Sequence, residues 1–119
     1  MTPEVFQERF LNFSADILSL VSKFPKSLAG RHIADQMLRS GTSVGAHLQE
    51  ARAGESRADF IHKIQVALKE LREVGYWLKL TSKAKLVEDA SLPGLADECE
   101  QLTAMLAQSV ITAKQNSRT

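Results

Sequence analysis

The residue types that most often carry metal or nucleophilic chemistry are sparse in this chain and widely spaced. His32, His47 and His62 lie fifteen residues apart, so none of them forms the i, i+4 pair typical of a zinc site. The single cysteine, Cys99, stands between two glutamates on an apolar stripe, where carboxylates raise the pKa of a thiol if they change it at all. We therefore expect no metal, no cofactor and no catalytic residue, and we interpret Cys99 as a core thiol.

The segment Gly41–Gly45 has the glycine spacing of a tight backbone approach. It is not a phosphate-binding loop, because the Lys-Ser/Thr ending of that motif is absent. A helix face made of small residues instead indicates close packing, either inside one chain or between chains.

The aromatic pair Tyr76-Trp77 has two interpretations. It is a base-stacking platform for nucleic acid, or it packs in the core or at a subunit interface. Adjacent helical residues point about 100° apart, so both rings cannot lie equally on one face. We favour packing.

Charge is unevenly distributed although the formal net charge is only +1. Residues 25–85 carry eleven basic and six acidic side chains, and the rest of the chain carries four basic and eight acidic ones. The central excess is either a phosphate-binding face or a solvated surface of ion-paired helices, and charge alone favours the second interpretation. The candidates for phosphate neutralisation are Arg39, Arg52, Arg57, Lys63 and Arg72.

These residues must be positioned by helices. The 119 residues correspond to a single domain, and the composition is rich in helix-forming residues, with only three prolines. Apolar residues recur at steps of three and four in four blocks, which predict an all-α, antiparallel up-down four-helix bundle. The expected helices cover residues 3–24, 28–52, 56–82 and 93–114.

Start and stop signals support these bounds. Thr2, Ser27 and Ser56 are expected N-caps, and Pro25 ends the first helix. We expect the second helix to run through its two glycines because the apolar pattern stays in phase; the alternative is a break at residues 40–42.

The third block carries apolar residues off its main stripe, among them Val66, Trp77 and Leu80. A helix that is apolar on more than one side needs more than one neighbour. A second copy of the chain would supply that neighbour, and the candidate interface residues are Gly41, Gly45, Val66 and Trp77.

No apolar run approaches the roughly 20 residues of a membrane helix. Glu4 and Glu8 also stand where a signal peptide would be basic and then apolar. We expect a cytoplasmic protein that does not contact a membrane.

Three ungapped segments resemble one family: MLRSGTSVGAHLQEA at residues 37–51, SRADFIHKI at 56–64 and LKELREVGYWL at 68–78. They are similar to the bacterial 23S rRNA intervening-sequence proteins, also called the S23 family. The chain departs from the family pattern at His47, where the family usually has asparagine, and at Gly75.

The resemblance implies an antiparallel four-helix bundle without enzymatic activity that assembles as a homo-oligomer, in several members a pentamer. It also implies RNA as the partner, and a likeness to the accessory protein of diversity-generating retroelements, which engages RNA and a reverse transcriptase. We expect a non-enzymatic, oligomeric RNA-binding bundle; the alternative is a protein-interaction scaffold or accessory subunit with no direct RNA role.

Overall fold

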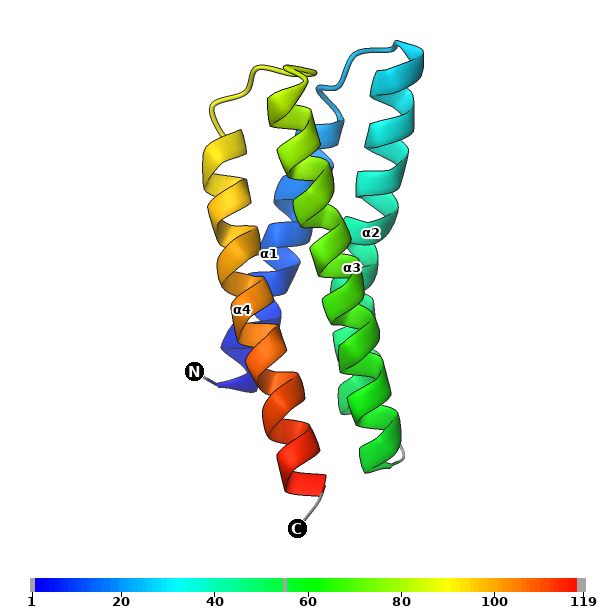
Figure 1. Ribbon diagram of the computed structural model, residues 1–119, viewed down its shortest axis with the longest axis vertical. Coiled ribbons are helices and arrows are strands. Elements are labelled where there is room, and N and C mark those ends of the chain that lie inside the picture. The colour runs from blue at the N-terminus through cyan, green and yellow to red at the C-terminus, as the bar shows by residue number, and fades with distance from the viewer. Residues whose placement is uncertain (1, 55, 118–119) are drawn as a thin grey trace.

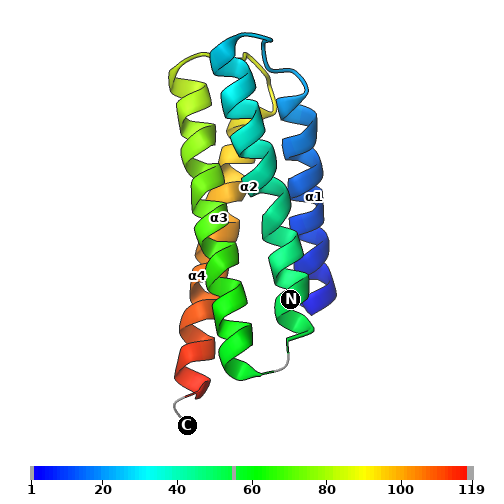
Figure 2. The ribbon, with the colours of Figure 1, turned by 90° about the vertical axis from the view of Figure 1, so that its right-hand side faces the viewer.

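The computed structural model describes residues 2–54 and 56–117, which form four helices joined by short connections. The helices run alternately up and down, so the bundle is all-α and antiparallel as predicted (Figures 1 and 2). The molecule measures 51 × 24 × 21 Å. The helices are α1 (Pro3–Val21), α2 (Leu28–Arg52), α3 (Arg57–Lys83) and α4 (Leu92–Ser117).

The three predicted N-caps are confirmed. The side-chain oxygen of Thr2 accepts a hydrogen bond from the backbone nitrogen of Val5, at 3.1 Å. Ser27 and Ser56 cap α2 and α3 in the same way, at 3.1 and 3.0 Å. Each cap satisfies one of the free N–H groups that every helix start presents.

Helix ends differ from the expected bounds by up to three residues. α1 ends at Val21 rather than at residue 24, because the backbone tightens into a turn in which Phe24 N–H bonds to Val21 O. α4 extends to Ser117 rather than to residue 114. The apolar stripe alone does not locate a final turn whose side chains face water.

α2 is continuous through Gly41 and Gly45, so the alternative break at residues 40–42 is excluded. Gly41 is buried, and a Cβ built on it would lie 2.8 Å from a methyl of Ile17 in α1. The Ser14 hydroxyl donates to the Gly41 carbonyl at 2.7 Å. Close packing at Gly41 is therefore inside the chain.

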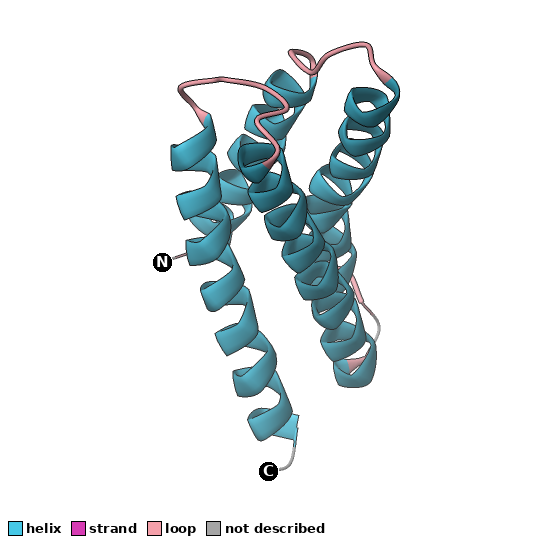
Figure 3. Cartoon of the chain, turned by 45° about the horizontal axis from the view of Figure 1, so that its top comes forward, coloured by secondary structure: helices cyan, strands magenta, loops and turns pink. Residues whose placement is uncertain are grey.

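The core lies between the four apolar stripes. α2 packs most extensively against α3 and α1 least extensively against α4 (Figure 3 gives a third view of the four helices). An ion pair links α1 to α4, from Arg9 to Glu98 at 2.6 Å. A second pair, from Lys23 to Asp89 at 2.8 Å, links the connection after α1 to the connection before α4. The largest fully buried side chains include Phe10, Phe13, Ile17, Leu20, Met37, Leu71, Leu78, Leu102 and Leu106.

Candidate nucleic-acid interface

Where α2 packs against α3, a network of charged side chains lies along the contact; we call it the α2/α3 seam (Arg39, Ser43 and Glu50 with Lys63, Glu70, Glu73 and Trp77). Arg39 Nη1 lies 3.1 Å from Glu70 Oε2, and Arg39 Nη2 contacts Glu73 Oε2. Lys63 Nζ lies 3.0 Å from Glu50 Oε2. The cations of this seam are neutralised within the chain.

Trp77 belongs to the same network. Its Nε1–H donates to Glu73 Oε2 at 3.1 Å, and its ring meets the His32 ring edge-on at a centroid distance of 6.2 Å. Val66 and Trp77 are both half-buried in the single chain. The seam therefore holds Trp77 in place without covering it.

The contacts shift the pKa values of the seam in the direction expected for paired charges. Burial alone would raise the pKa of Glu73, but hydrogen bonds from Trp77 and Arg39 outweigh it and lower the pKa. The hydrogen bond with Lys63 lowers the pKa of Glu50, and the same contact raises the pKa of Lys63. These charges serve the packing of α2 on α3.

The five arginine and lysine candidates from the sequence fall into two groups. Arg39 and Lys63 belong to the seam, and Arg52 Nη2 lies 3.9 Å from Glu4 Oε1. Arg57 and Arg72 are exposed and contact no carboxylate among the residues that the structure describes. Within residues 2–54 and 56–117, only the second group lacks a carboxylate partner.

Sequence reasoning missed three further cations. Lys69, Lys79 and Lys83 lie with Arg72 and Tyr76 on one face of α3, which we call the α3 outer face (Lys69, Arg72, Tyr76, Lys79 and Lys83). Their steps of three and four along the sequence are the signal that could have found them. Tyr76 is 60% exposed, so packing inside the chain does not account for it.

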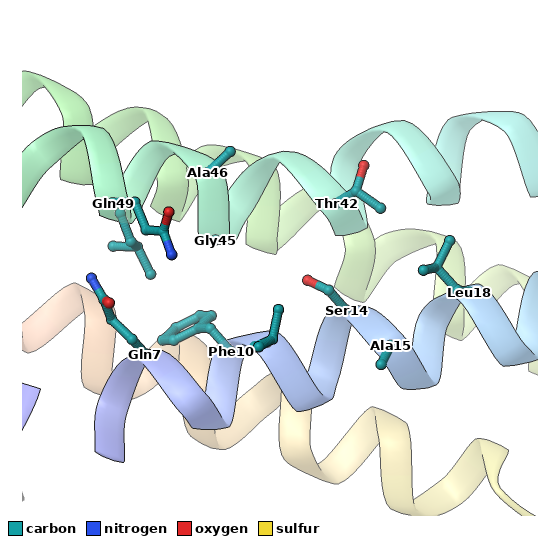
Figure 4. A pocket seen from close by; sticks show the side chains of 11 residues that line it. Gln7, Phe10, Ser14, Ala15, Leu18, Thr42, Gly45, Ala46 and Gln49 are labelled. Carbon is teal, nitrogen blue, oxygen red and sulfur yellow. The ribbon is translucent and has the colours of Figure 1, made fainter. Parts of the chain in front are cut away.

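A second surface is apolar. Between α1 and α2 the molecule has a hollow of about 350 Å³ (Figure 4), with Gln7 and Gln49 toward one end and Leu18 and Thr42 toward the other. A Cβ built on Gly45 would meet nothing within 4 Å, so this glycine faces open space. Gly41 lies beneath this surface against α1 and is not available to a second copy of the chain.

Cys99 is the buried core thiol that its stripe predicts. Burial raises its pKa to about 11, and its Sγ donates to the Leu71 carbonyl at 3.6 Å. Within residues 2–54 and 56–117, no three histidine, cysteine or carboxylate side chains are placed to hold a metal ion. None of the helices in that part of the chain is both long and apolar enough to cross a bilayer.

The fold and the surface together define a small antiparallel four-helix bundle. Its distinguishing features are the basic α3 outer face and the apolar hollow between α1 and α2. The family model of the 23S rRNA-intervening sequence protein matches residues 4–108, and the chain belongs to this family.

One solved structure that it resembles is the crystal structure of a protein with unknown function from the S23 ribosomal protein family of Bacteroides thetaiotaomicron. The TM-score is 0.76 at 30% identity, over 88% of this chain and 97% of that chain. No curated protein matches the chain.

Proposed function

We propose that this protein is a non-enzymatic, homo-oligomeric, cytoplasmic RNA-binding bundle that neutralises phosphates with lysine and arginine side chains of α2 and α3. The observation that carries the proposal is the set of exposed α3 cations without a carboxylate contact among the described residues. An unpaired surface cation binds phosphate without first giving up another partner, and it releases counterions when it does so. Membership of the 23S rRNA-intervening sequence protein family supports RNA as the partner.

Within the five sequence candidates, the proposal now rests on Arg57 and Arg72. Arg39 is held by two glutamates and Lys63 by one, so a phosphate would compete with carboxylates already in place. Arg52 has a longer contact with Glu4 and takes an intermediate position. These differences predict unequal contributions from side chains of the same charge.

Assembly into a homo-oligomer is part of the proposal. Val66 and Trp77 are half-buried, and Gly45 faces the apolar hollow beside Leu11 and Leu18, which are 62% and 48% exposed. Exposed apolar surface of this kind is typical of protein contacts. A ring of identical chains, such as the pentamer that the resemblance implies, would repeat the basic α3 face around one axis and strengthen its field.

Binding of a labelled 23S rRNA fragment, measured by fluorescence anisotropy across a salt series, tests the RNA role. We expect the logarithm of the affinity to fall linearly with the logarithm of salt concentration. Replacing Arg57 and Arg72 together by glutamine should reduce the slope by roughly 2, about 1 for each lost phosphate contact. Arg39→Gln is the matched control and should change the slope less. Absence of binding at low salt would contradict the proposal.

The mass of the purified protein in solution tests assembly. We expect a multiple of the chain mass, five-fold if the pentamer of the resemblance applies. Gly45→Gln should disturb the single chain little, because a Cβ there meets nothing within 4 Å, and it should reduce the mass if a second copy packs there. A wild-type mass equal to that of one chain would remove assembly from the proposal.

The second candidate is a protein-interaction scaffold or accessory subunit, for example of a reverse transcriptase. The apolar hollow between α1 and α2 favours it, because it offers a contact for another protein with no basic residue among those that line it. Reversing the charge of Arg57 separates the two candidates. Loss of assembly with unchanged RNA affinity favours the scaffold, and loss of RNA affinity with unchanged mass favours RNA binding.

A further inference from the structure

The α3 outer face combines a row of cations with an exposed aromatic ring. The residues follow one another at steps of three and four, which places Lys69, Arg72, Tyr76, Lys79 and Lys83 on one side of the helix. At a rise of 1.5 Å per residue the row extends over roughly 21 Å, with the ring near its middle. Phosphate neutralisation uses the cations and leaves the ring without a role.

The ring of Tyr76 is held by its neighbour. It meets the ring of Trp77 edge-on, with a centroid distance of 5.2 Å and an interplanar angle of 70°. Trp77 is in turn fixed by its hydrogen bond to Glu73 and by the edge of His32. The ring is thereby oriented before any ligand arrives, while 60% of the Tyr76 side chain stays exposed.

A groove runs beside the ring between α3 and α4. It has a volume of about 490 Å³, within the range of small-molecule sites, and Arg72, Tyr76 and Lys79 line it. Its α4 side consists mainly of small side chains such as Ala104 and Ala107. Gly75 also lines it, and a Cβ there would be in ordinary van der Waals contact with the buried Cys99 sulfur, at 3.5 Å. The groove gives a flat ligand room to lie against the ring.

We propose that the α3 outer face binds single-stranded RNA, with phosphates on the cations and one base stacked on Tyr76 in the α3/α4 groove. This inference rests on the proposed function and narrows its ligand. Cations interleaved with an exposed aromatic ring are typical of single-strand binding, because every base has a face that can stack. Bases inside a duplex already stack on one another and present only phosphates and sugars to such a surface.

One carboxylate opposes the ligand. Among the described residues that line the groove, Glu100 on α4 carries the only negative charge. It repels phosphate and so places the backbone of the RNA along α3, with the base turned toward the groove. Glu100→Gln should therefore strengthen binding, by roughly two- to threefold for one exposed charge.

The test compares the binding of a short single-stranded RNA of mixed sequence with that of a duplex of the same sequence, using all 119 residues of the chain. Tyr76→Leu keeps an apolar side chain at an exposed position, so the fold is not at risk. We expect it to weaken single-strand binding about tenfold, as loss of one stacked base does elsewhere. Duplex binding should stay unchanged. Tyr76→Phe, which keeps the ring, is the matched control and should retain both affinities.

Trp77 is the only tryptophan and gives a second readout. A base stacked on Tyr76 alters the surroundings of the neighbouring indole, so its fluorescence should change on titration with the single strand. The change should be smaller with the duplex, and smaller again in Tyr76→Leu.

The outcomes separate the two levels of the proposal. Absence of binding of either RNA overturns the proposed function and this inference with it. Binding of both RNAs with no effect of Tyr76→Leu overturns the inference and leaves the proposed function intact. A lower solution mass of Tyr76→Leu also overturns the inference, because it would place the ring in a contact between chains. Poly-glutamate that displaces the single strand equally well from the wild type and from Tyr76→Leu overturns it too, because the ring would then add nothing to RNA binding.

Discussion

α3 presents two charged surfaces that look alike in the sequence and differ in three dimensions. Toward α2, its Lys63 pairs with Glu50, and its Glu70 and Glu73 both pair with Arg39. On the outer face, Lys69, Arg72, Lys79 and Lys83 form no salt bridge with a carboxylate among the described residues, although the charge of Lys69 helps to lower the pKa of Glu73. The comparison teaches that a chain with a net charge near zero can still present cations to a ligand, at positions where the fold gives them no carboxylate partner.

The two glycines of α2 differ in the same way. Gly41 is in contact with Ile17, whereas nothing lies within 4 Å of the position where a Cβ of Gly45 would stand. One glycine is required by packing that already exists, and the other leaves room. A residue that already contacts another part of the chain stabilises the fold. A residue without such a contact is free to contact another molecule.

Charge reversal on the outer face is the change with the largest expected effect. Replacing Arg72 and Lys79 together by glutamate removes two phosphate contacts and adds repulsion, so RNA affinity at low salt should fall about 100-fold and the salt slope by roughly 2. The free energy of unfolding should change by no more than about 0.5 kcal/mol, because neither side chain forms an ion pair with a residue that the structure describes. Anisotropy and urea unfolding measure the two quantities. A large loss of stability with little loss of affinity would reverse the roles assigned to the two surfaces.

The glycine pair predicts opposite changes in stability from the same substitution. Gly45→Ala should raise the free energy of unfolding by about 0.5–1 kcal/mol, because alanine is the better helix former and its methyl group meets nothing. Gly41→Ala has the same gain, but its Cβ would overlap the buried Ile17 methyl, and overpacking costs about 1–3 kcal/mol. Urea unfolding of the two variants should therefore give shifts of opposite sign, and shifts of equal sign would contradict the contact at Gly41.

The fold could be predicted almost completely from the sequence, and the surfaces only in part. Apolar stripes repeat along each helix, so the four helices and the continuity of α2 follow from local spacing, and the N-caps of α1, α2 and α3 follow from local residue types. Pairing of Arg39 depends on where Glu70 and Glu73 lie across the seam, which is set by the packing of two helices. No local pattern reports that alignment, so a paired and an unpaired arginine look the same.

The exposed cations of α3 also show what the sequence does not report. The spacing of Lys69, Lys79 and Lys83 can be read from the sequence, but which side of α3 faces water depends on how α2 and α4 pack on it. The core residues of α3 are found because burial follows hydrophobicity. A functional surface has no equally general signal, and charge totals over a segment average the two faces of the helix together.

Acid should weaken the seam more than the outer face. Contacts in the folded protein lower the pKa of Glu73, so its stabilising contribution is present above the unfolded-state pKa near 4.5 and is lost as the pH falls through the lower folded-state pKa. Glu73→Gln should remove this part of the pH dependence, an effect of up to about 1 kcal/mol for a pair near the surface. Thermal unfolding between neutral and strongly acidic pH measures it. Glu8→Gln, at a residue that forms no salt bridge among the described residues, is the control for the loss of one surface carboxylate.

The hydrogen bond between Trp77 and Glu73 tests whether the seam acts as one network. Trp77→Phe removes the Nε1–H donor and keeps an aromatic ring, so the hydrogen bond accounts for about 0.5–1.5 kcal/mol of the lost stability. A double-mutant cycle with Glu73→Ala, which removes the acceptor, isolates that part, because loss of ring area appears in both arms and cancels. A coupling energy near zero would mean that Arg39 alone holds Glu73. In that case Trp77 would be oriented by His32 and by packing, and the ring of Tyr76 would have a weaker support than the network provides.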